Sequence, residues 1–509
     1  MPRTGSANIE RYDNTHINEY TNKSNSNNGG NGRRKKKVPI FFKVIFVIYL
    51  LVSILFFGYV VKMNMLPTMY LSILAGLDFV ITGLICLGIV RKHKKLTKNI
   101  ICTILACGIM AIYAYAFNYL HATMSFIGTM SQEVEETEDY YVITLNNGKL
   151  NKIEDIDGKN LHVFSTTEDY EDVKNDISSK VKVTFKEDES LEKLAKDILS
   201  WKSYVALVSA SQYEMIKDDN EGFDTKTKII YTVSHKIKNA DTSDINDKNS
   251  NLNIKNGIFN VYISGIDTSG KISNVSRSDA NILATVNTKT KTVLLTSIPR
   301  DYYVTLHSKK AKDKLTHSGI YGVKETVSTV EDLFGTDINY YVRVNFTTLI
   351  KLVDTLGGID VNSDYNFTAQ GYKFVKGTNH LNGQKALAFS RERHAFADGD
   401  RQRVKNQQIV MEAIMKKVLN STTILTKYTS ILNSLSGSFQ TNIAQEDISK
   451  LVKDQLNDMS GWKFETISVN GTGASQTTYS AGSQKLYVMI PDMSTVEAAK
   501  TKINTTLGK

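Results

Sequence analysis

Residues 257–301 read GIFNVYISGIDTSGKISNVSRSDANILATVNTKTKTVLLTSIPRD, and this stretch sets the expected fold. Three apolar runs within it, Ile258–Ser264, Ile282–Asn287 and Val293–Ile298, have the length and the β-branched content of buried strands. Charged and polar residues gather near the ends of these runs. We therefore expect a sheet whose strand ends carry the chemistry of the protein.

Helical patterns alternate with strands downstream of this stretch. Lys324–Phe334 and Thr347–Leu356 are helical and each is followed by a glycine, which is a common helix-ending signal. Ile338–Val344 is strand-like, and Arg401–Leu419 is a long amphipathic helix. Strands interleaved with helices predict an α/β domain whose mostly parallel or mixed sheet is covered by helices on both faces.

Four segments of this domain concentrate charged groups at strand ends and loops. They are Gly265–Thr268, Ser276–Asp279, Ser297–Asp301 and Ser390–Gln407. Ligands of open α/β sheets bind beyond the strand ends, so charges at these positions favour function over scattered surface polarity. Arg403 and Gln407 lie four residues apart on the long helix and therefore share one of its faces.

The residue types in these segments favour an anion site beside a metal ion. Guanidinium groups bind phosphate and carboxylate bidentately, so arginines gathered at strand ends indicate an anionic ligand. Asp267 and Asp279 each lie by a strand end, and Mg²⁺ takes one or two carboxylates together with water and substrate phosphates. Such a set is typical of phosphoryl transfer. Asp400 either caps the long helix alone or also has a catalytic role.

Three apolar runs precede this domain, at Val38–Val61, Leu66–Val90 and Ile100–Leu120. Each approaches the ~20 residues that cross ~30 Å of hydrocarbon, so we expect three transmembrane helices. Basic residues precede the first run and fill the loop between the second and third. The positive-inside rule then predicts a cytoplasmic N-terminus and an extracytoplasmic region after the third helix. Asp78, within the second run, is either a functional carboxylate or a helix-packing residue.

The basic charge of the chain belongs to its membrane segment. Of the net charge of +10, residues 1–120 carry 15 Lys and Arg against 4 Asp and Glu, which leaves the remainder near −1. The soluble region thus lacks the basic surface that nucleic-acid binding requires, and we expect no nucleic-acid partner. Cys86, Cys102 and Cys107 all lie in the apolar runs, so the soluble region offers neither a disulfide nor a thiol nucleophile.

The chain divides into four expected parts. They are a polar, disordered leader at 1–37, the transmembrane helices at 38–120, a small α+β accessory domain at 121–250 and the α/β domain at 251–509. In the accessory domain we expect strands at Tyr140–Leu145, Leu161–Ser165 and Val181–Phe185 and helices at Ser190–Leu199 and Val205–Met215. The polar stretch Asn239–Asn253 is typical of a linker or long surface loop.

Other chemistries are not indicated by the sequence. It contains no G-x-x-x-x-G-K-[ST], G-x-S-x-G or H-E-x-x-H motif. Of the nine histidines, only His317 and His394 approach the charged segments. A histidine for which the sequence indicates no catalytic partner is more often structural than catalytic.

Six ordered motifs resemble those of the LytR–CpsA–Psr family. They are Gly265–Asp267, Ser276–Asp279, Ser297–Asp301, Lys314–His317, Leu356–Val361 and the block Arg391–Gln407. Three membrane runs before an accessory domain resemble the capsule-associated, CpsA-type branch. One departure stands out, because the family segment Lys-Ile-Asn-Ala is here Lys314-Leu315-Thr316-His317.

The resemblance implies an α-β-α sandwich catalytic domain with a central mixed sheet and a hydrophobic groove for a polyprenyl tail. It implies a phosphotransferase that moves a capsular or wall glycopolymer from polyprenyl pyrophosphate to peptidoglycan. Asp267 and Asp279 would hold Mg²⁺, with Mn²⁺ as the alternative. Asp400 would orient an arginine or accept the proton of the acceptor hydroxyl. The pyrophosphate would be bound by Arg300, Lys314, Arg391, Arg393, Arg403 and Gln407.

Two alternative functions stay open at the level of sequence. A pyrophosphatase that uses water as the acceptor would need the same residues. A non-enzymatic regulator of the cell envelope would need a cytoplasmic part that binds DNA or a partner. The polar leader at 1–37 is too short to fold as such a domain, which disfavours direct control of transcription.

Overall fold

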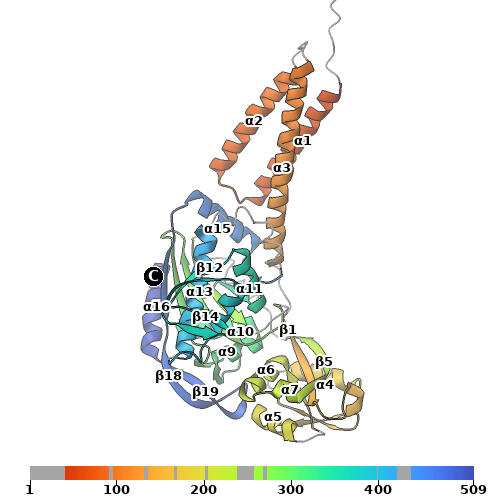
Figure 1. The fold of residues 1–509 in the computed structure, drawn as a ribbon, viewed down its shortest axis with the longest axis vertical. Helices are drawn as coiled ribbons and strands as arrows, with labels where there is room; N and C mark the ends of the chain where they lie inside the picture. The colour runs from red at the N-terminus through yellow and green to blue at the C-terminus, as the bar shows by residue number, and fades with distance from the viewer. Residues whose placement is uncertain are drawn as a thin grey trace, which may run out of the picture.

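A computed structural model describes residues 40–90, 96–130, 136–165, 169–200, 204–237, 257–266, 272–397, 399–420 and 437–509. It shows a helical bundle, a large α/β domain (257–509) and a small domain (136–237) along one long axis (Figure 1). The large domain lies between the bundle and the small domain, although the small domain comes first in the chain. The predicted leader and the predicted polar linker lie outside the described residues.

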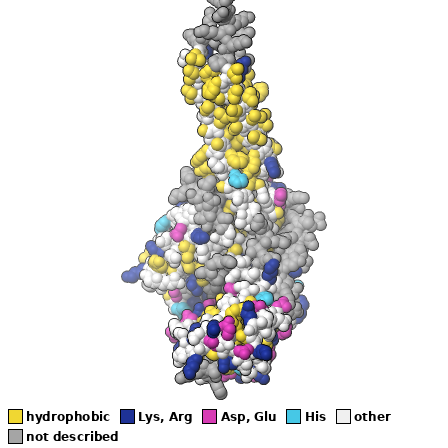
Figure 2. Space-filling model, turned by 90° about the vertical axis from the view of Figure 1, so that its right-hand side faces the viewer, with side chains coloured by type: hydrophobic (Ala, Val, Ile, Leu, Met, Phe, Trp, Pro, Cys, Tyr) yellow, Lys and Arg dark blue, Asp and Glu magenta, His cyan; other side chains and the backbone are white. Residues whose placement is uncertain are grey.

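The bundle consists of three helices that are long and apolar enough to cross a membrane: α1 (Ile40–Met63), α2 (Thr68–Val90) and α3 (Leu96–Met130). On the face shown in Figure 2, hydrophobic side chains gather over this bundle. The three predicted runs are therefore confirmed as helices. The third helix continues past its predicted end at Leu120, because its last turns carry apolar side chains that pack against the large domain.

Asp78 of α2 lies where the three helices meet. Its carboxylate accepts hydrogen bonds from Tyr49 at 2.8 Å and from Ser53 at 2.7 Å, both on α1, and a further one from Tyr113 of α3. Three hydroxyl donors therefore satisfy an intramembrane carboxylate. This arrangement fits the helix-packing interpretation of Asp78.

The small domain is built on a five-stranded mixed sheet of order β3-β2-β4-β1-β5. Its strands are β1 (Thr137–Leu145), β2 (Asn160–Val163), β3 (Thr184–Glu187), β4 (Val205–Ser209) and β5 (Thr227–Lys236). Its helices are η1 (Ile153–Ile156), α4 (Asp169–Ser178), α5 (Leu191–Ser200), α6 (Ala210–Asp219) and α7 (Phe223–Lys226).

One predicted element of the small domain is wrong. The helix expected at Val205–Met215 is a strand, β4, followed by helix α6. Every residue of β4 is buried, and its neighbours β1 and β2 pair with it on both edges. Ser209 then caps α6 by accepting a hydrogen bond from the backbone N–H of Gln212 at 3.2 Å. A short apolar run of this kind does not by itself distinguish a buried strand from a helix.

The large domain contains the predicted central mixed sheet, of order β16-β11-β6-β7-β8-β17. The pairs β11–β6 and β8–β17 are parallel and the others antiparallel. The strands are β6 (Ile258–Ile266), β7 (Ser278–Asn287), β8 (Thr292–Ile298), β11 (Tyr340–Val344), β16 (Gln440–Thr441) and β17 (Lys463–Ser468).

Helices cover both faces of this sheet. One face packs against α9 (Leu315–Ser318), η2 (Gly319–Tyr321), α10 (Val323–Phe334) and α16 (Met493–Leu507), the other against α13 (Asp400–Asn420) and α15 (Gln445–Asn457). Successive residues of β7 serve the two cores, because strand side chains alternate between faces. Leu283 packs with α10 and α16, whereas Ile282 packs with α13 and α15. The predicted α/β class and α-β-α layers are confirmed.

A further core lies beside the sheet and encloses the site described below. It joins α13 to α11 (Phe346–Thr355), α12 (Gly383–Arg391), β12 (Ile359–Ser363), β13 (Phe367–Ala369), β14 (Tyr372–Phe374) and β15 (Gly377–Leu381). The helix α12 approaches α11 closely at Gly383. A Cβ there would lie 2.3 Å from the carbonyl oxygen of Ile350, so this contact requires glycine.

A hairpin of β18 (Gly471–Thr478) and β19 (Gly482–Pro491) connects the large and small domains. Near its turn Ala481 and Leu486 pack into the core of the small domain, and Gly482 forms a β-bridge with Ser190. The same hairpin contacts the segment of β9 (Tyr303–Thr305) and β10 (Lys312–Lys314), where Tyr303 donates a hydrogen bond to the carbonyl of Thr477 at 2.9 Å. Sequence analysis did not identify this hairpin.

Two further contacts join the large domain to the rest of the chain. Helix α15 packs on the ends of α1 and α3, with Ile448 and Val452 against Met63 and Ile127. Glu136, which begins the small domain, forms a fully buried ion pair with Arg343 of β11.

Candidate active site

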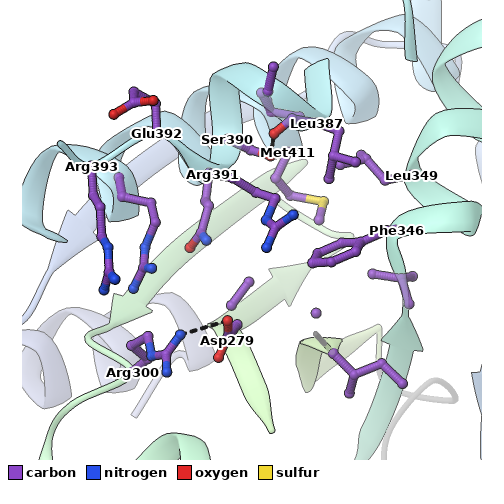
Figure 3. Close-up of a pocket in the computed structure, with 18 of the residues that line it drawn as sticks. Asp279, Arg300, Phe346, Leu349, Leu387, Ser390, Arg391, Glu392, Arg393 and Met411 are labelled. Atoms are coloured by element: carbon purple, nitrogen blue, oxygen red, sulfur yellow. Dashed lines mark hydrogen bonds and ion pairs between the residues drawn. The ribbon is translucent and has the colours of Figure 1, made fainter. Parts of the chain in front are cut away.

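A cavity of about 360 Å³ opens between the central sheet and the helices α11, α12 and α13 (Figure 3). Its wall on the sheet side comes from the ends of β6 and β11, the beginning of β7 and Arg300 after β8. Four of the predicted motif segments therefore converge on one place, although they are spread over residues 265–407. One end of the cavity is charged and the other is apolar.

Two helices bring cationic and amide side chains to the charged end. On α13, Arg403 and Gln407 face the cavity, followed one turn later by Val410 and Met411, as the helical spacing requires. Helix α12 ends at Arg391, because the next residue, Glu392, has an extended backbone with ψ of 131°. The chain then turns, and Arg391 and Arg393 both line the cavity (Figure 3).

Arg300 and Asp279 form the floor of the charged end. Their side chains meet at 2.7 Å, and Thr316 of α9 donates a second hydrogen bond to Asp279 at 2.9 Å. Burial alone would raise the pKa of the Asp279 carboxyl, but the guanidinium groups of Arg300, Arg277 and Arg403 together lower it below its ordinary value. The carboxylate is thus held ionised at the edge of a cationic site.

The other end of the cavity is an apolar groove. Ile266 and Ile282 of the sheet face Phe346 and Leu349 of α11 across it, with Leu387, Val410 and Met411 completing the wall. The guanidinium of Arg391 lies over the ring of Phe346 at 4.3 Å from its centroid, so one cation–π contact marks the boundary between the two ends (Figure 3). A ligand that fits the whole cavity must be anionic at one end and apolar at the other.

The structure brings six of the predicted site residues together in this cavity. They are Asp279, Arg300, Arg391, Arg393, Arg403 and Gln407. Lys314 is not part of the lining, because its ammonium is paired with Asp301 at 3.1 Å on the far side of Arg300. Asp267 lies outside the described residues, as does the side chain of Asp400, with which α13 begins. For these two the predicted roles stay predictions.

Sequence reasoning missed several residues of the site. Arg277, 3 % exposed, lies close enough to Asp279 to lower its pKa, yet it was named only as part of a motif. Asn345 and Phe346 line the groove at the start of α11, where Asn345 caps the helix through the backbone N–H of Thr348 at 2.9 Å. The predicted strand end at Val344 could have indicated both residues, because residues that follow a strand end lie at the ligand-binding edge of an α/β sheet.

A divalent cation such as Mg²⁺, when bound at the charged end, would take the carboxylate of Asp279 as a ligand. Asp279 faces the cavity with its side chain 17 % exposed, and it is ionised. Mg²⁺ is commonly held by one or two carboxylates and completes its octahedron with water and phosphate oxygens. Within the described residues no group of three or more His, Cys, Asp or Glu side chains could enclose a metal without a ligand, so a cation here would depend on substrate oxygens.

Chemically, the cavity combines four arginines, the ionised carboxylate of Asp279, the side chain of Glu392 at its rim and an apolar groove. Guanidinium groups neutralise phosphate oxygens bidentately and would stabilise charge that develops on them during transfer. The groove suits a hydrocarbon chain. Fold and site together define a class of α/β protein suited to a lipid that carries a phosphorylated head group.

Comparisons with known proteins agree with this class. Residues 227–504 match the model of the LytR_cpsA_psr family, and the chain belongs to this family. A polyisoprenyl-teichoic acid–peptidoglycan teichoic acid transferase TagU of Enterococcus faecalis is 34 % identical over 253 residues, which is 49 % of this chain and 82 % of that protein. The TagU of Bacillus subtilis strain 168 is 36 % identical over 246 residues, 48 % of this chain and 79 % of that protein.

One solved structure is reported for comparison. The crystal structure of B. subtilis TagU is 32 % identical and covers 50 % of this chain and 98 % of its own, with a TM-score of 0.39.

Proposed function

We propose that this chain is an extracytoplasmic phosphotransferase that moves a wall or capsular glycopolymer from a polyprenyl pyrophosphate carrier to peptidoglycan. Its membership of the family and the names of the TagU relatives support the reaction class. The observation that carries the proposal is the convergence of Arg300, Arg391, Arg393 and Arg403 beside Asp279, at the mouth of an apolar groove. The basic residues before α1 and between α2 and α3 support the extracytoplasmic placement.

Each part of the cavity has a distinct task in this reaction. The groove around Phe346 and Met411 would bind the polyprenyl tail, and the four arginines would hold the two phosphates. Because the polyprenyl phosphate leaves with additional negative charge, cations placed beforehand around its oxygens lower the barrier. Mg²⁺ held by Asp279 and Asp267 would add to this neutralisation when bound. Arg391, which contacts both Phe346 and the charged end, would fix the junction between tail and head group.

The proposal is tested by removing one arginine and a matched cation from the same helix. Arg403 lines the cavity and is 6 % exposed, whereas Lys405, two residues on, forms an exposed ion pair with Asp364. We expect Arg403→Ala to lower the rate of transfer about 10²–10³-fold, by analogy with other preorganised charge-stabilising groups. Lys405→Ala should transfer at the wild-type rate.

The assay measures polymer that becomes attached to peptidoglycan and polyprenyl phosphate that is released, in cells and with purified full-length protein. Attachment at the wild-type level in Arg403→Ala cells would refute the proposal. Release of polyprenyl phosphate at the same rate with and without a peptidoglycan acceptor would instead identify a pyrophosphatase that uses water.

A further inference from the structure

A second cleft, of only about 50 Å³, lies at Arg300 between the large and small domains, which is room for a hydroxyl-bearing group but not for a whole sugar. The large domain contributes the cationic side and the hairpin β18–β19, and the small domain contributes the opposite wall from α5 and α6. Its lining residues from the large domain are Arg277, Arg300, Lys314, His317, Gln484 and Leu486. Arg300 lines both this cleft and the main cavity, so the two spaces meet at the residue that would bind the phosphates.

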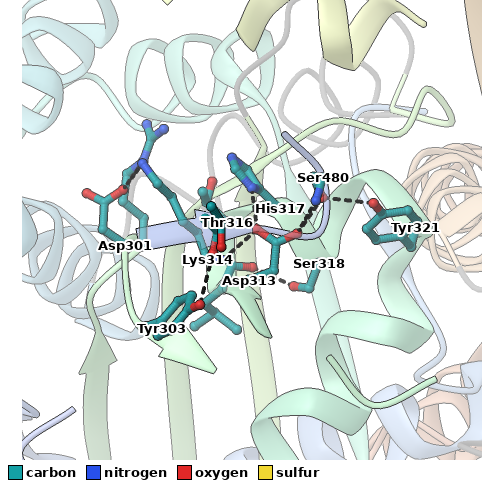
Figure 4. A network of polar contacts seen from close by, with 12 residues as sticks. Asp301, Tyr303, Asp313, Lys314, Thr316, His317, Ser318, Tyr321 and Ser480 are labelled. Atoms are coloured by element: carbon teal, nitrogen blue, oxygen red, sulfur yellow. Dashed lines mark hydrogen bonds and ion pairs between the residues drawn. The ribbon is translucent and has the colours of Figure 1, made fainter. Parts of the chain in front are cut away.

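A buried His–Asp pair stands at the wall of this cleft. His317 and Asp313 are 3 % and 0 % exposed, and His317 Nδ1 lies 2.6 Å from Asp313 Oδ1 (Figure 4). The other oxygen of Asp313 accepts from the backbone N–H and the hydroxyl of Ser480, at 2.8 and 2.5 Å. The backbone N–H of Lys314 donates to Oδ1 at 2.7 Å. Asp313 is therefore surrounded by donors.

This donor set determines the tautomer of the histidine. Burial raises the pKa of Asp313, but the interaction with His317 and the hydrogen bonds from Ser480 and Lys314 outweigh it and leave the pKa below its ordinary value. An ionised carboxylate can only accept, so the proton between the pair must be on Nδ1 of His317. In the neutral ring, Nε2 is then a lone-pair acceptor. Among the described residues no hydrogen bond involves Nε2, and the ring borders the cleft.

The pair is rigidly connected to the phosphate-binding end. Thr316, next to His317, donates to Asp279 at 2.9 Å, and its own backbone N–H donates to the carbonyl of Arg300 at 2.8 Å. On the other side, Ser480 lies near the turn of the β18–β19 hairpin and also contacts the hydroxyl of Tyr321 at 2.8 Å. The ring of His317 is thus held in place from α9, β10 and the hairpin together (Figure 4).

The small domain supplies polar groups across the cleft from this ring. Glu192 and Asp219 lie on its wall, and Asp219 accepts a hydrogen bond from Gln484 at 2.9 Å. The apolar residues Leu191, Met215 and Ile216 line the same wall. Carboxylates and amides that line a cleft together with a histidine suit a hydroxyl group of a sugar. The cleft meets the main cavity at Arg300 and shares none of the apolar groove residues, so a hydroxyl that enters through it would not displace the lipid.

We propose that His317, oriented by Asp313, is the general base that accepts the proton of the acceptor sugar hydroxyl at this cleft. The step rests on the proposed function. The hydroxyl oxygen forms a bond to the phosphorus that carries the glycopolymer, and the bond from that phosphorus to the bridging oxygen breaks. Polyprenyl phosphate leaves with the electron pair. The hydroxyl proton passes to Nε2 of His317 and then to water, so atoms and charge balance.

The charge around His317 is mixed. Asp313 on β10 faces its Nδ1. The large domain lines the same cleft with Arg277, Arg300 and Lys314, and the small domain lines it with Glu192 and Asp219. Only the neutral ring accepts a proton, so a protonated His317 cannot act as the base. The rate of transfer should therefore rise as pH increases and then level off.

The test uses full-length protein in detergent with a polyprenyl-pyrophosphate-linked disaccharide and soluble glycan strands. We expect His317→Gly to lower transfer about 10²–10⁴-fold, to remove the rise with pH, and to recover activity when free imidazole is added. The matched control is His380→Gly, which removes a histidine from an exposed pair with Asp360 in the same domain. It should keep both the rate and the pH profile and gain nothing from imidazole.

A second variant guards against simple misfolding. Asp313→Asn keeps the size of the side chain but no longer selects the Nδ1 tautomer, so we expect a lower rate and a displaced pH profile with retained circular dichroism. An unchanged pH profile in folded His317→Gly and Asp313→Asn would overturn the inference. Loss of the pH dependence in Asp400→Asn alone would also overturn it and would assign the base to Asp400. Absence of transfer by the wild-type protein would instead refute the proposed function.

Discussion

Removal of Arg343 is the most informative perturbation of the junction between the domains. Its guanidinium contacts Glu136, donates to Gln440 at 3.1 Å and to the carbonyl of Asn274 at 3.2 Å, and is 2 % exposed. Glu136 also accepts from the backbone N–H of Val323 at 3.1 Å. Arg343→Met keeps the volume and apolar stem but leaves a buried carboxylate with one backbone donor.

The expected cost is about 3–5 kcal/mol, the usual effect of removing one partner from a buried ion pair. Replacing both partners, Glu136→Leu with Arg343→Met, should recover most of this loss, because no buried charge is left uncompensated. Burial already raises the pKa of the Glu136 carboxyl, although Arg343 opposes the shift. Without Arg343 the pKa rises further, so the folded variant takes up a proton and its stability falls as pH increases.

The measurement is urea unfolding of the full-length protein in detergent, followed by tryptophan fluorescence at pH 5 and pH 8. The deficit of Arg343→Met relative to wild type should be larger at pH 8. A loss below about 1 kcal/mol, or a double variant as unstable as the single one, would contradict the buried ion pair described above.

Two further substitutions test the packing of the site and of the bundle. A Cβ on Gly319 would lie 2.5 Å from the carbonyl oxygen of Ser276. Gly319→Ala should therefore displace the segment before β7, lower the free energy of unfolding by about 1–3 kcal/mol and slow transfer. The control is Gly461→Ala, which has open space around it, and equal stability of the two variants would contradict the contact. Asp78→Leu should destabilise the helical bundle by about 1–3 kcal/mol in detergent unfolding, since three hydroxyls lose their acceptor. Unchanged unfolding of Asp78→Leu would argue for a role other than packing.

Sequence alone was enough for the features that depend on local pattern. The length and hydropathy of the three apolar runs predicted α1–α3, and the strand and helix periodicities around residues 257–356 predicted the mixed sheet and its two helical layers. The positions of arginines at strand ends predicted the anion site, because an α/β sheet gathers its strand ends at one edge. Motif order was sufficient for the family.

Tertiary structure decided what depends on contacts between distant segments. The strand at Val205–Ser209 was mistaken for a helix because only its pairing with β1 and β2 distinguishes it. Lys314 carries the right charge for the anion site, yet Asp301 holds it on the other side of Arg300. His317 gained a partner only when β10 and the β18–β19 hairpin brought Asp313 and Ser480 around it. Periodicity records which face of an element is buried, whereas the partner that covers that face is set by the packing of the whole chain.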